Sequence, residues 1–143
     1  MYAVQQDMVT RFGNAEMVQL TNDALDATQI GVDKMNGALA DASAEIDGYL
    51  QGQYALPLAN PPAILTIYCC DIARYRLFDA RATEQVQARY DAAIRYLKQV
   101  GAGTLGLGLG TDGKDLSEAG GVLSSAPGCQ VFTSDKLKDY TRG

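Results

Sequence analysis

Charged side chains that could form a chemical site gather in one stretch of this chain. Asp71, Arg74 and Arg76 stand close together, and Asp47 stands in an earlier amphipathic segment. A carboxylate beside a guanidinium can bind a polar ligand, and on a helix Asp71 and Arg74 share one face. No nucleophile and base accompany them, as acyl or phosphoryl transfer would need. The pattern therefore predicts a structural polar network that locks helices or subunits together, with Asp47 pairing with Arg74 or Arg76.

Three other patterns resemble chemical motifs, and each lacks a required part. The GLGLG run at residues 106–110 has no Walker Lys-Ser/Thr pair, and it follows a predicted helix instead of a strand. The acidic connection at residues 21–31 lacks the glycine and the terminal glutamate of an EF-hand at the needed spacings. Histidine is absent, which removes the commonest general base. We therefore expect no catalytic residues, no metal site and no cofactor, and we do not expect an enzyme.

The cysteines and tyrosines point to packing. Cys69 and Cys70 lie in an apolar helical stretch, and with Cys129 they make an odd number, so we expect reduced core thiols. Most of the eight tyrosines fall on predicted helical faces, where base stacking would need a basic groove that the sequence does not show. We therefore assign them to core and interface packing. They are Tyr49, Tyr68, Tyr75, Tyr90 and Tyr96.

The overall composition is that of one acidic, folded domain. The chain has 143 residues, 47% of them hydrophobic, and 12 basic against 17 acidic residues give a net charge of −5. An acidic chain of this size is not expected to bind nucleic acid through its overall field. No apolar run approaches the ~20 residues of a membrane span, and the first residues do not form a secretory signal. These features predict a protein that stays in the cytoplasm unless it is built into a larger assembly.

Apolar residues recur at helical spacing in three long segments. The first runs from Val32 to about Gly52, the second from Pro61 or Pro62 to about Asp79, and the third from a Thr83 cap to Gly101. Two short helices precede them, with Gly13 as the stop of one and Asn14 as the cap of the other. Gly48, inside the first long helix, is expected to allow a neighbour to pack closely.

The composition changes after residue 100, where glycine becomes frequent. The predicted fold is all-α, with a helical domain at residues 1–100 and a flexible or extended C-terminal arm at residues 101–143. Apolar residues on such an arm have little local core to join, so we expect them to dock on another chain. These residues are Leu105, Leu107, Leu109, Val131, Phe132, Leu137 and Tyr140.

Several long segments together resemble a known family. They are MYAVQQDMVTRFG, LADASAEIDGYLQGQYALPL, CDIARYRLFDARATEQVQARYDAAIRYL and VFTSDKL. Over nearly the whole chain they are similar to small proteins that Mu-like phages and prophages encode among their head and tail genes. That family in turn resembles the helical head–tail adaptor, or head-completion, proteins of long-tailed phages.

The resemblance implies a structural role in the virion. Adaptor subunits form a ring, commonly twelve-fold, beneath the portal protein, and their C-terminal arms grip neighbouring proteins. The expected partners are further copies of this chain, the portal, and a tail-side connector or tail-terminator protein. DNA would pass through the channel without specific binding, since an acidic lining offers phosphates no counter-charge. We expect no membrane partner, and a location at the head–tail interface after assembly in the host cytoplasm. The alternative is an assembly factor or regulatory module that acts on capsid or tail proteins without entering the virion.

Overall fold

A computed structural model describes residues 1–109 of the chain, and all regular elements in that part are helical. Two short helices, α1 (Gln5–Phe12) and α2 (Asn14–Thr21), precede three longer ones. The longer helices are α3 (Val32–Leu50), α4 (Ala63–Phe78) and α5 (Glu84–Gly101), with a 3₁₀ turn, η1 (Asp79–Arg81), between the last two. The all-α prediction is therefore confirmed.

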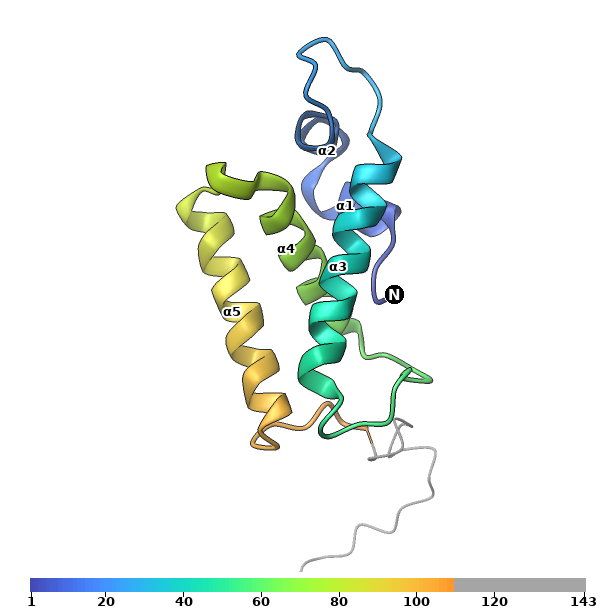
Figure 1. The fold of residues 1–143 in the computed structure, drawn as a ribbon, viewed down its shortest axis with the longest axis vertical. Coiled ribbons are helices and arrows are strands. Elements are labelled where there is room, and N and C mark those ends of the chain that lie inside the picture. Colours follow the sequence, from blue (N-terminus) through green and yellow to red (C-terminus); the bar gives the residue numbers. More distant parts are fainter. Residues whose placement is uncertain (110–143) are drawn as a thin grey trace, which may run out of the picture.

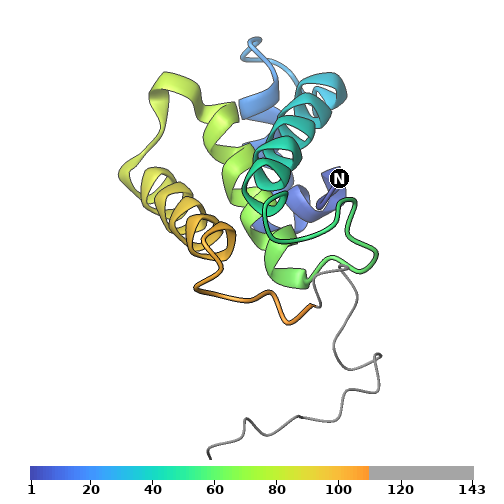
Figure 2. The same cartoon turned by 60° about the horizontal axis from the view of Figure 1, so that its bottom comes forward.

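The helices α3, α4 and α5 form a three-helix bundle, and successive helices run in opposite directions along it (Figures 1 and 2). Each contributes an apolar stripe to one hydrophobic core. Fully buried side chains at the centre of this core are Leu39, Ile46, Leu50, Leu65, Ile72 and Leu97. Cys69 and Cys70 are also fully buried as free thiols, which confirms their assignment to the core.

Residues 2–21, called here the N-terminal clasp, comprise α1 and α2 and lie against α3 and α4. Met8 and Met17 are fully buried and join the clasp to the bundle core. Gly13 separates the two helices with a φ of 88°, a conformation that glycine adopts without steric cost. The predicted stop at Gly13 is therefore confirmed, whereas Asn14 is the first residue of α2 and Gly13 occupies the cap position.

The predicted start of α5 is confirmed, because the Thr83 hydroxyl oxygen accepts a hydrogen bond from the Val86 N–H at 3.4 Å. The close approach expected at Gly48 is found elsewhere. Space beside Gly48 is open, because no described atom outside the adjoining residues and turns of α3 lies within 4 Å of an added Cβ. At Gly101 an added Cβ would lie 2.7 Å from the Tyr49 carbonyl oxygen. The bundle therefore needs a glycine where α5 ends against α3, and not inside α3.

The first residues after α5 remain with the body, which corrects the expectation of an uncovered arm from residue 101. Leu107 and Leu109 are 9% and 7% exposed and belong to the hydrophobic core. The Leu107 N–H donates a hydrogen bond of 2.9 Å to the Tyr54 hydroxyl oxygen, in the connection between α3 and α4. Burial of these two leucines is favourable because it removes apolar surface from water. The local glycine content, from which the arm was predicted, does not indicate this burial.

No helix within residues 1–109 is both long enough and apolar enough to cross a lipid bilayer.

Candidate functional site

The predicted polar network of Asp47, Asp71, Arg74 and Arg76 is divided among separate contacts. Arg74 pairs with Glu16, Arg76 pairs with Glu45, and Asp71 lies 3.6 Å from Arg89. Asp47 accepts a hydrogen bond from the Tyr2 hydroxyl. Each contact joins a different pair of segments, so the four residues do not form one site.

Asp47 holds the start of the chain in place. Besides the Tyr2 hydroxyl bond to Asp47, the Tyr2 N–H donates to the Ser43 hydroxyl oxygen at 3.2 Å, and the Thr66 hydroxyl donates to the Tyr2 carbonyl at 2.9 Å. Burial, with the neighbouring Asp47 charge and hydrogen bond, raises the pKa of Tyr2. The predicted pairing of Asp47 with an arginine of α4 is therefore wrong, because the N-terminal residues fill that position.

Arg74 ties α2 to α4. Its Nε and Nη2 donate to the two carboxylate oxygens of Glu16 at 2.6 and 3.1 Å, the bidentate geometry that suits a guanidinium. The guanidinium carbon also lies 4.5 Å from the ring centre of Phe12 and 5.6 Å from that of Phe78. Arg74 therefore attaches the clasp to α4.

A second cluster joins α3, α4 and α5 around Glu45. Its carboxylate accepts from Arg76 at 2.6 Å and from the Tyr90 hydroxyl at 3.1 Å. Tyr90 also stacks on Tyr75 with ring centres 4.1 Å apart. Burial first, and then the Glu45 charge, raise the pKa of Tyr90 to about 12. The structure thus assigns two of the tyrosines expected on helical faces to a contact between helices, as predicted.

Asp71 is the buried carboxylate of the group. Burial raises its pKa, and the charge of Arg89 on α5 opposes that shift. Its ion-pair partner is therefore on α5. The charge of Arg74 on the same helix also lowers the pKa of Asp71, although Arg74 itself pairs with Glu16.

Sequence reasoning missed the partners Tyr2, Glu16, Glu45 and Arg89. Arg74 and Glu16 are 58 positions apart, and Arg76 and Glu45 are 31 apart. The sequence showed the charges of these four ion-pairing residues but not which of them would meet. Pairing depends on which helix faces meet, and a single sequence does not specify that.

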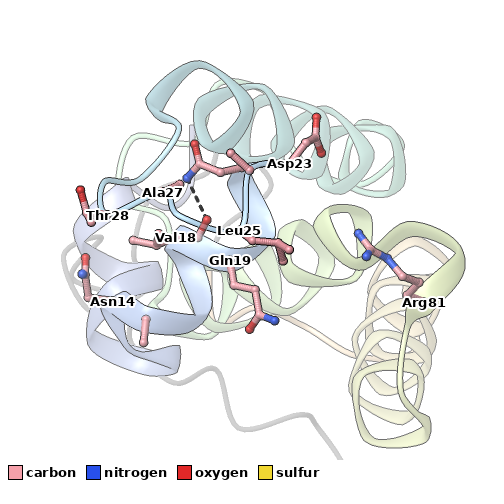
Figure 3. A pocket seen from close by; sticks show the side chains of 11 residues that line it. Asn14, Val18, Gln19, Asp23, Leu25, Ala27, Thr28 and Arg81 are labelled. Atoms are coloured by element: carbon pink, nitrogen blue, oxygen red, sulfur yellow. Dashed lines mark hydrogen bonds between the residues drawn. The ribbon is translucent and has the colours of Figure 1, made fainter.

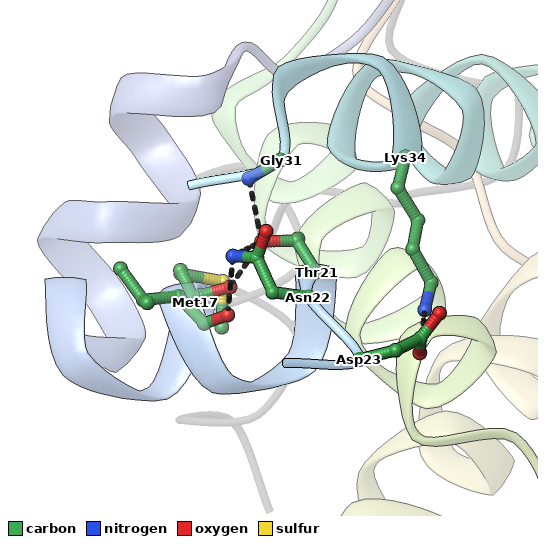
Figure 4. Close-up of polar contacts among 7 residues, drawn as sticks. Met17, Thr21, Asn22, Asp23, Gly31 and Lys34 are labelled. Atoms are coloured by element: carbon green, nitrogen blue, oxygen red, sulfur yellow. Dashed lines mark hydrogen bonds and ion pairs between the residues drawn. The ribbon is translucent and has the colours of Figure 1, made fainter. Parts of the chain in front are cut away.

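The connection between α2 and α3 is closed by side chains that bond to backbone groups (Figure 4). The Thr21 hydroxyl donates to the Met17 carbonyl at 2.7 Å, and its oxygen accepts from the Gly31 N–H at 2.8 Å. The Asn22 amide donates to the Gln29 carbonyl at 2.6 Å. An added Cβ at Gly31 would lie 2.5 Å from the Thr21 carbonyl oxygen. Thr21 and Gly31 therefore bring the two ends of residues 22–30 together.

This closed connection borders a cavity of about 610 Å³ beside α2 (Figure 3). Val18 and Leu25 supply apolar lining, Asn14 and Gln19 supply amides, and Arg81 of η1 supplies a positive charge. Leu25 is fully exposed. An open surface with an exposed leucine, amides and one guanidinium can contact a polypeptide through both apolar and polar groups.

The cavity and the last described residues lie at opposite ends of the body (Figure 1). Among residues predicted to dock on partners, Leu107 and Leu109 are buried, and Leu105 is 38% exposed. The other four, Val131, Phe132, Leu137 and Tyr140, lie outside the described residues. Within residues 1–109, no group of three or more Cys, Asp or Glu side chains is arranged to hold a metal ion.

Comparison with known proteins assigns the family. The sequence pattern of the family described as "Bacteriophage Mu, Gp36" matches residues 2–126, which is most of the chain. The chain belongs to this family. Among its relatives is the "Mu-like prophage FluMu protein gp36" of Haemophilus influenzae, which is 39% identical over 127 residues, or 88% of this chain and 89% of the relative. "Gene product J" of Escherichia phage Mu is 37% identical over 99 residues, or 69% of this chain and 70% of that protein. The predicted resemblance to Mu-like phage proteins is confirmed.

Proposed function

We propose that this chain is a structural virion protein, a head–tail connector or head-completion subunit. Its copies form a ring below the portal and join the capsid to the tail. Membership of the Mu Gp36 family carries this proposal. The step from the family to connector function is an analogy with helical adaptor proteins, so it needs its own test.

The two ends of the body support a connecting role. One end presents the α2–α3 connection with its exposed Leu25, and the described part of the chain ends at Leu109, at the other end of the body (Figure 1). A subunit that joins two structures needs a contact at each end. We propose that residues 110–143 reach one neighbour, while Leu25 and the adjoining cavity meet another.

The mechanism is mechanical, with no catalytic step. The clasp and the bundle are cross-linked by Arg74–Glu16, and the bundle is cross-linked within itself by Glu45. A body braced in this way transmits load between its ends. Its acidic balance lets DNA slide past, because phosphates find few counter-charges along it.

The proposal is tested by deleting the gene in the phage or prophage that carries it and examining the particles. The expected result is DNA-filled heads and separate tails, with the protein present in purified wild-type virions by mass spectrometry. Empty or aberrant shells, with no protein in wild-type virions, would overturn it and favour the assembly factor.

Partner binding is tested with Leu25→Asp. This change places a charge at the exposed tip and leaves the core untouched. Purified portal and tail-side proteins are mixed with wild-type protein or the variant, and the complexes are separated by size. Loss of one of the two complexes is expected. Retention of both would exclude Leu25 as a contact.

A further inference from the structure

The end of the body opposite the α2–α3 connection is built from segments without charged residues. They are residues 48–70, from the last turn of α3 into the first half of α4, and residues 99–109, which end α5 and follow it (Figure 2). The three longest runs of the chain without Asp, Glu, Lys or Arg are residues 48–70, 99–111 and 119–134, and every other such run is less than half as long. Two of the three therefore meet at one end, called here the uncharged end.

Apolar side chains at the uncharged end are only partly covered within residues 1–109. Leu105 is 38% exposed, and Tyr54, Leu56 and Ile64 are half-buried against the core. Each of these side chains keeps apolar surface in contact with water. Further apolar groups placed against them would remove that surface from water, which is favourable.

The charged residues that adjoin these segments in the described sequence are Asp47, Asp71 and Lys98. Asp47 already accepts the hydrogen bond of Tyr2, and Asp71 is paired with Arg89. A charged side chain brought against this end would thus lose water and find little counter-charge, and that loss is costly. The group that covers the uncharged end should therefore be apolar and free of charge.

The chain itself contains a segment of that composition. Residues 119–134, AGGVLSSAPGCQVFTS, form the third long uncharged run. Charged residues are frequent on both sides of it, in residues 112–118 and 135–142. Its large apolar side chains are Val122, Leu123, Val131 and Phe132.

The connection to this segment is short and starts at the uncharged end. Leu109 is 7% exposed there, and residues 110–118 join it to Ala119. These residues span at most about 30 Å, at 3.3–3.6 Å per residue. A short connection raises the effective concentration of a tethered segment to about the millimolar range. The length of the connection therefore favours the molecule's own segment over that of a second copy.

We propose that residues 119–134 cover the uncharged end of their own molecule. The apolar side chains of this segment lie against Tyr54, Leu56, Ile64 and Leu105. Such a contact buries apolar surface and leaves no charge of either side without a partner.

This contact divides the residues that were expected to dock on another chain. Val131 and Phe132 cover their own body, whereas Leu137 and Tyr140, in the charged residues that follow, remain for a neighbour. The inference concerns the single molecule, so it does not depend on the proposed function. Its test uses the free protein, and the presence of the protein in virions neither supports nor contradicts it.

Disulfide capture within the full-length protein tests the contact. Cys129 lies inside the segment, and the other two cysteines, Cys69 and Cys70, are buried. Ala55→Cys places a thiol at an exposed position of the uncharged end, beside Tyr54. On oxidation with glutathione disulfide, the variant is expected to form a bond between residues 55 and 129, detected by peptide mass spectrometry.

The control is Ala15→Cys, at an exposed position of α2 near the other end of the body. Capture by Cys129 should be several-fold greater with Ala55→Cys than with Ala15→Cys under the same oxidation. The fraction captured should stay constant when the protein is diluted, because both thiols belong to one molecule. Equal capture at the two positions would overturn the contact. Covalent dimers that increase with protein concentration would assign the segment to a second copy and would also overturn it.

A charge inside the segment makes the test specific. Phe132→Asp, added to the Ala55→Cys protein, should lower capture several-fold, because a carboxylate then enters the uncharged end. Leu137→Asp is the matched control outside the segment and should leave capture unchanged. Circular dichroism and thermal unfolding confirm that each variant keeps its fold. Unchanged capture with Phe132→Asp, or an equal loss with Leu137→Asp, would overturn the contact.

Discussion

The bundle of α3, α4 and α5 and the N-terminal clasp are stabilised in different ways. The bundle buries long apolar stripes, with Leu39, Ile46 and Leu97 fully covered. The clasp has two short helices with only Met8 and Met17 among their apolar side chains fully buried, while Phe12 and Leu20 pack partly buried against the core. Hydrogen bonds of Tyr2 and Glu16 add to this attachment. Short helices are marginal alone, so the clasp depends on contacts with the bundle.

The two parts therefore differ in how much of their attachment comes from apolar burial. Apolar burial in the bundle scales with area and tolerates small shifts. Hydrogen bonds in the clasp require exact partners, and a lost partner leaves a polar group unsatisfied. The clasp should therefore open at a lower free energy than the bundle.

The largest loss of stability is expected from Ile46→Ala, which removes a core side chain of the bundle. Ile46 is fully buried, and its truncation leaves a cavity, so the free energy of unfolding should fall by about 2–5 kcal/mol. Urea denaturation followed by circular dichroism measures this. Hydrogen exchange should accelerate in α3, α4 and α5 together. A loss confined to α1 and α2 would contradict the proposed division.

A smaller loss is expected from Gly101→Ala, where α5 approaches α3. The new Cβ would meet the Tyr49 carbonyl oxygen, and overpacking of this kind costs about 1–3 kcal/mol. Gly48→Ala is the matched control, since its surroundings are open and alanine favours the helix by about 0.5–1 kcal/mol. Thermal unfolding should place the two variants on opposite sides of the wild type. Equal shifts would show that the Gly101 contact is dispensable.

The clasp is tested with Glu16→Gln, which removes the charge that faces Arg74. Hydrogen bonds to charged groups contribute about 1.5–3 kcal/mol, and partial exposure of this pair reduces that to about 1–2 kcal/mol. Hydrogen exchange should rise in α1 and α2 while protection of α5 stays unchanged. Lys34→Gln, which removes the exposed pair with Asp23, is the control and should change stability little. Equal acceleration of hydrogen exchange in all helices would show that the clasp and the bundle open together.

The smallest effect concerns pH and the contact around Glu45. Because the pKa of Tyr90 is raised to about 12 in the folded state, folding favours its neutral form. The stabilisation is complete below pH 10, the ordinary pKa of tyrosine, and is lost as the pH rises from 10 to 12. Tyr90→Phe should therefore show a shallower fall in the free energy of unfolding over this range. Urea titrations at several pH values measure the slope. If the free energy of unfolding fell equally steeply with pH in Tyr90→Phe, ionisation of Tyr90 would not be the cause of that fall.

Local pattern predicted most of the bundle. The spacing of apolar residues located α3, α4 and α5, Thr83 marked the start of α5, and Gly13 marked the break in the clasp. These features depend on residues within a few turns of each other, which a sequence displays directly. The burial of Cys69 and Cys70 followed from the same periodicity.

Contacts between distant segments were not predictable in this way. The pairing of Asp47 with an arginine was expected from charge, and Tyr2 takes that place. Leu107 and Leu109 were assigned to an arm because glycine surrounds them, and tertiary packing buries them beside Tyr54. In each case several partners of suitable chemistry existed in the sequence. The relative placement of the helices selected one of them.

Local patterns in the sequence indicated which segments are helical, which of their faces are apolar and which family the chain resembles. These depend on local periodicity and on the order of residues. The packing of the helices selected which charges meet, where the backbone approaches closely and how Leu107 and Leu109 are covered. Those outcomes depend on the angle and register at which helices pack, and the energy of that packing is summed over many side chains distant in sequence.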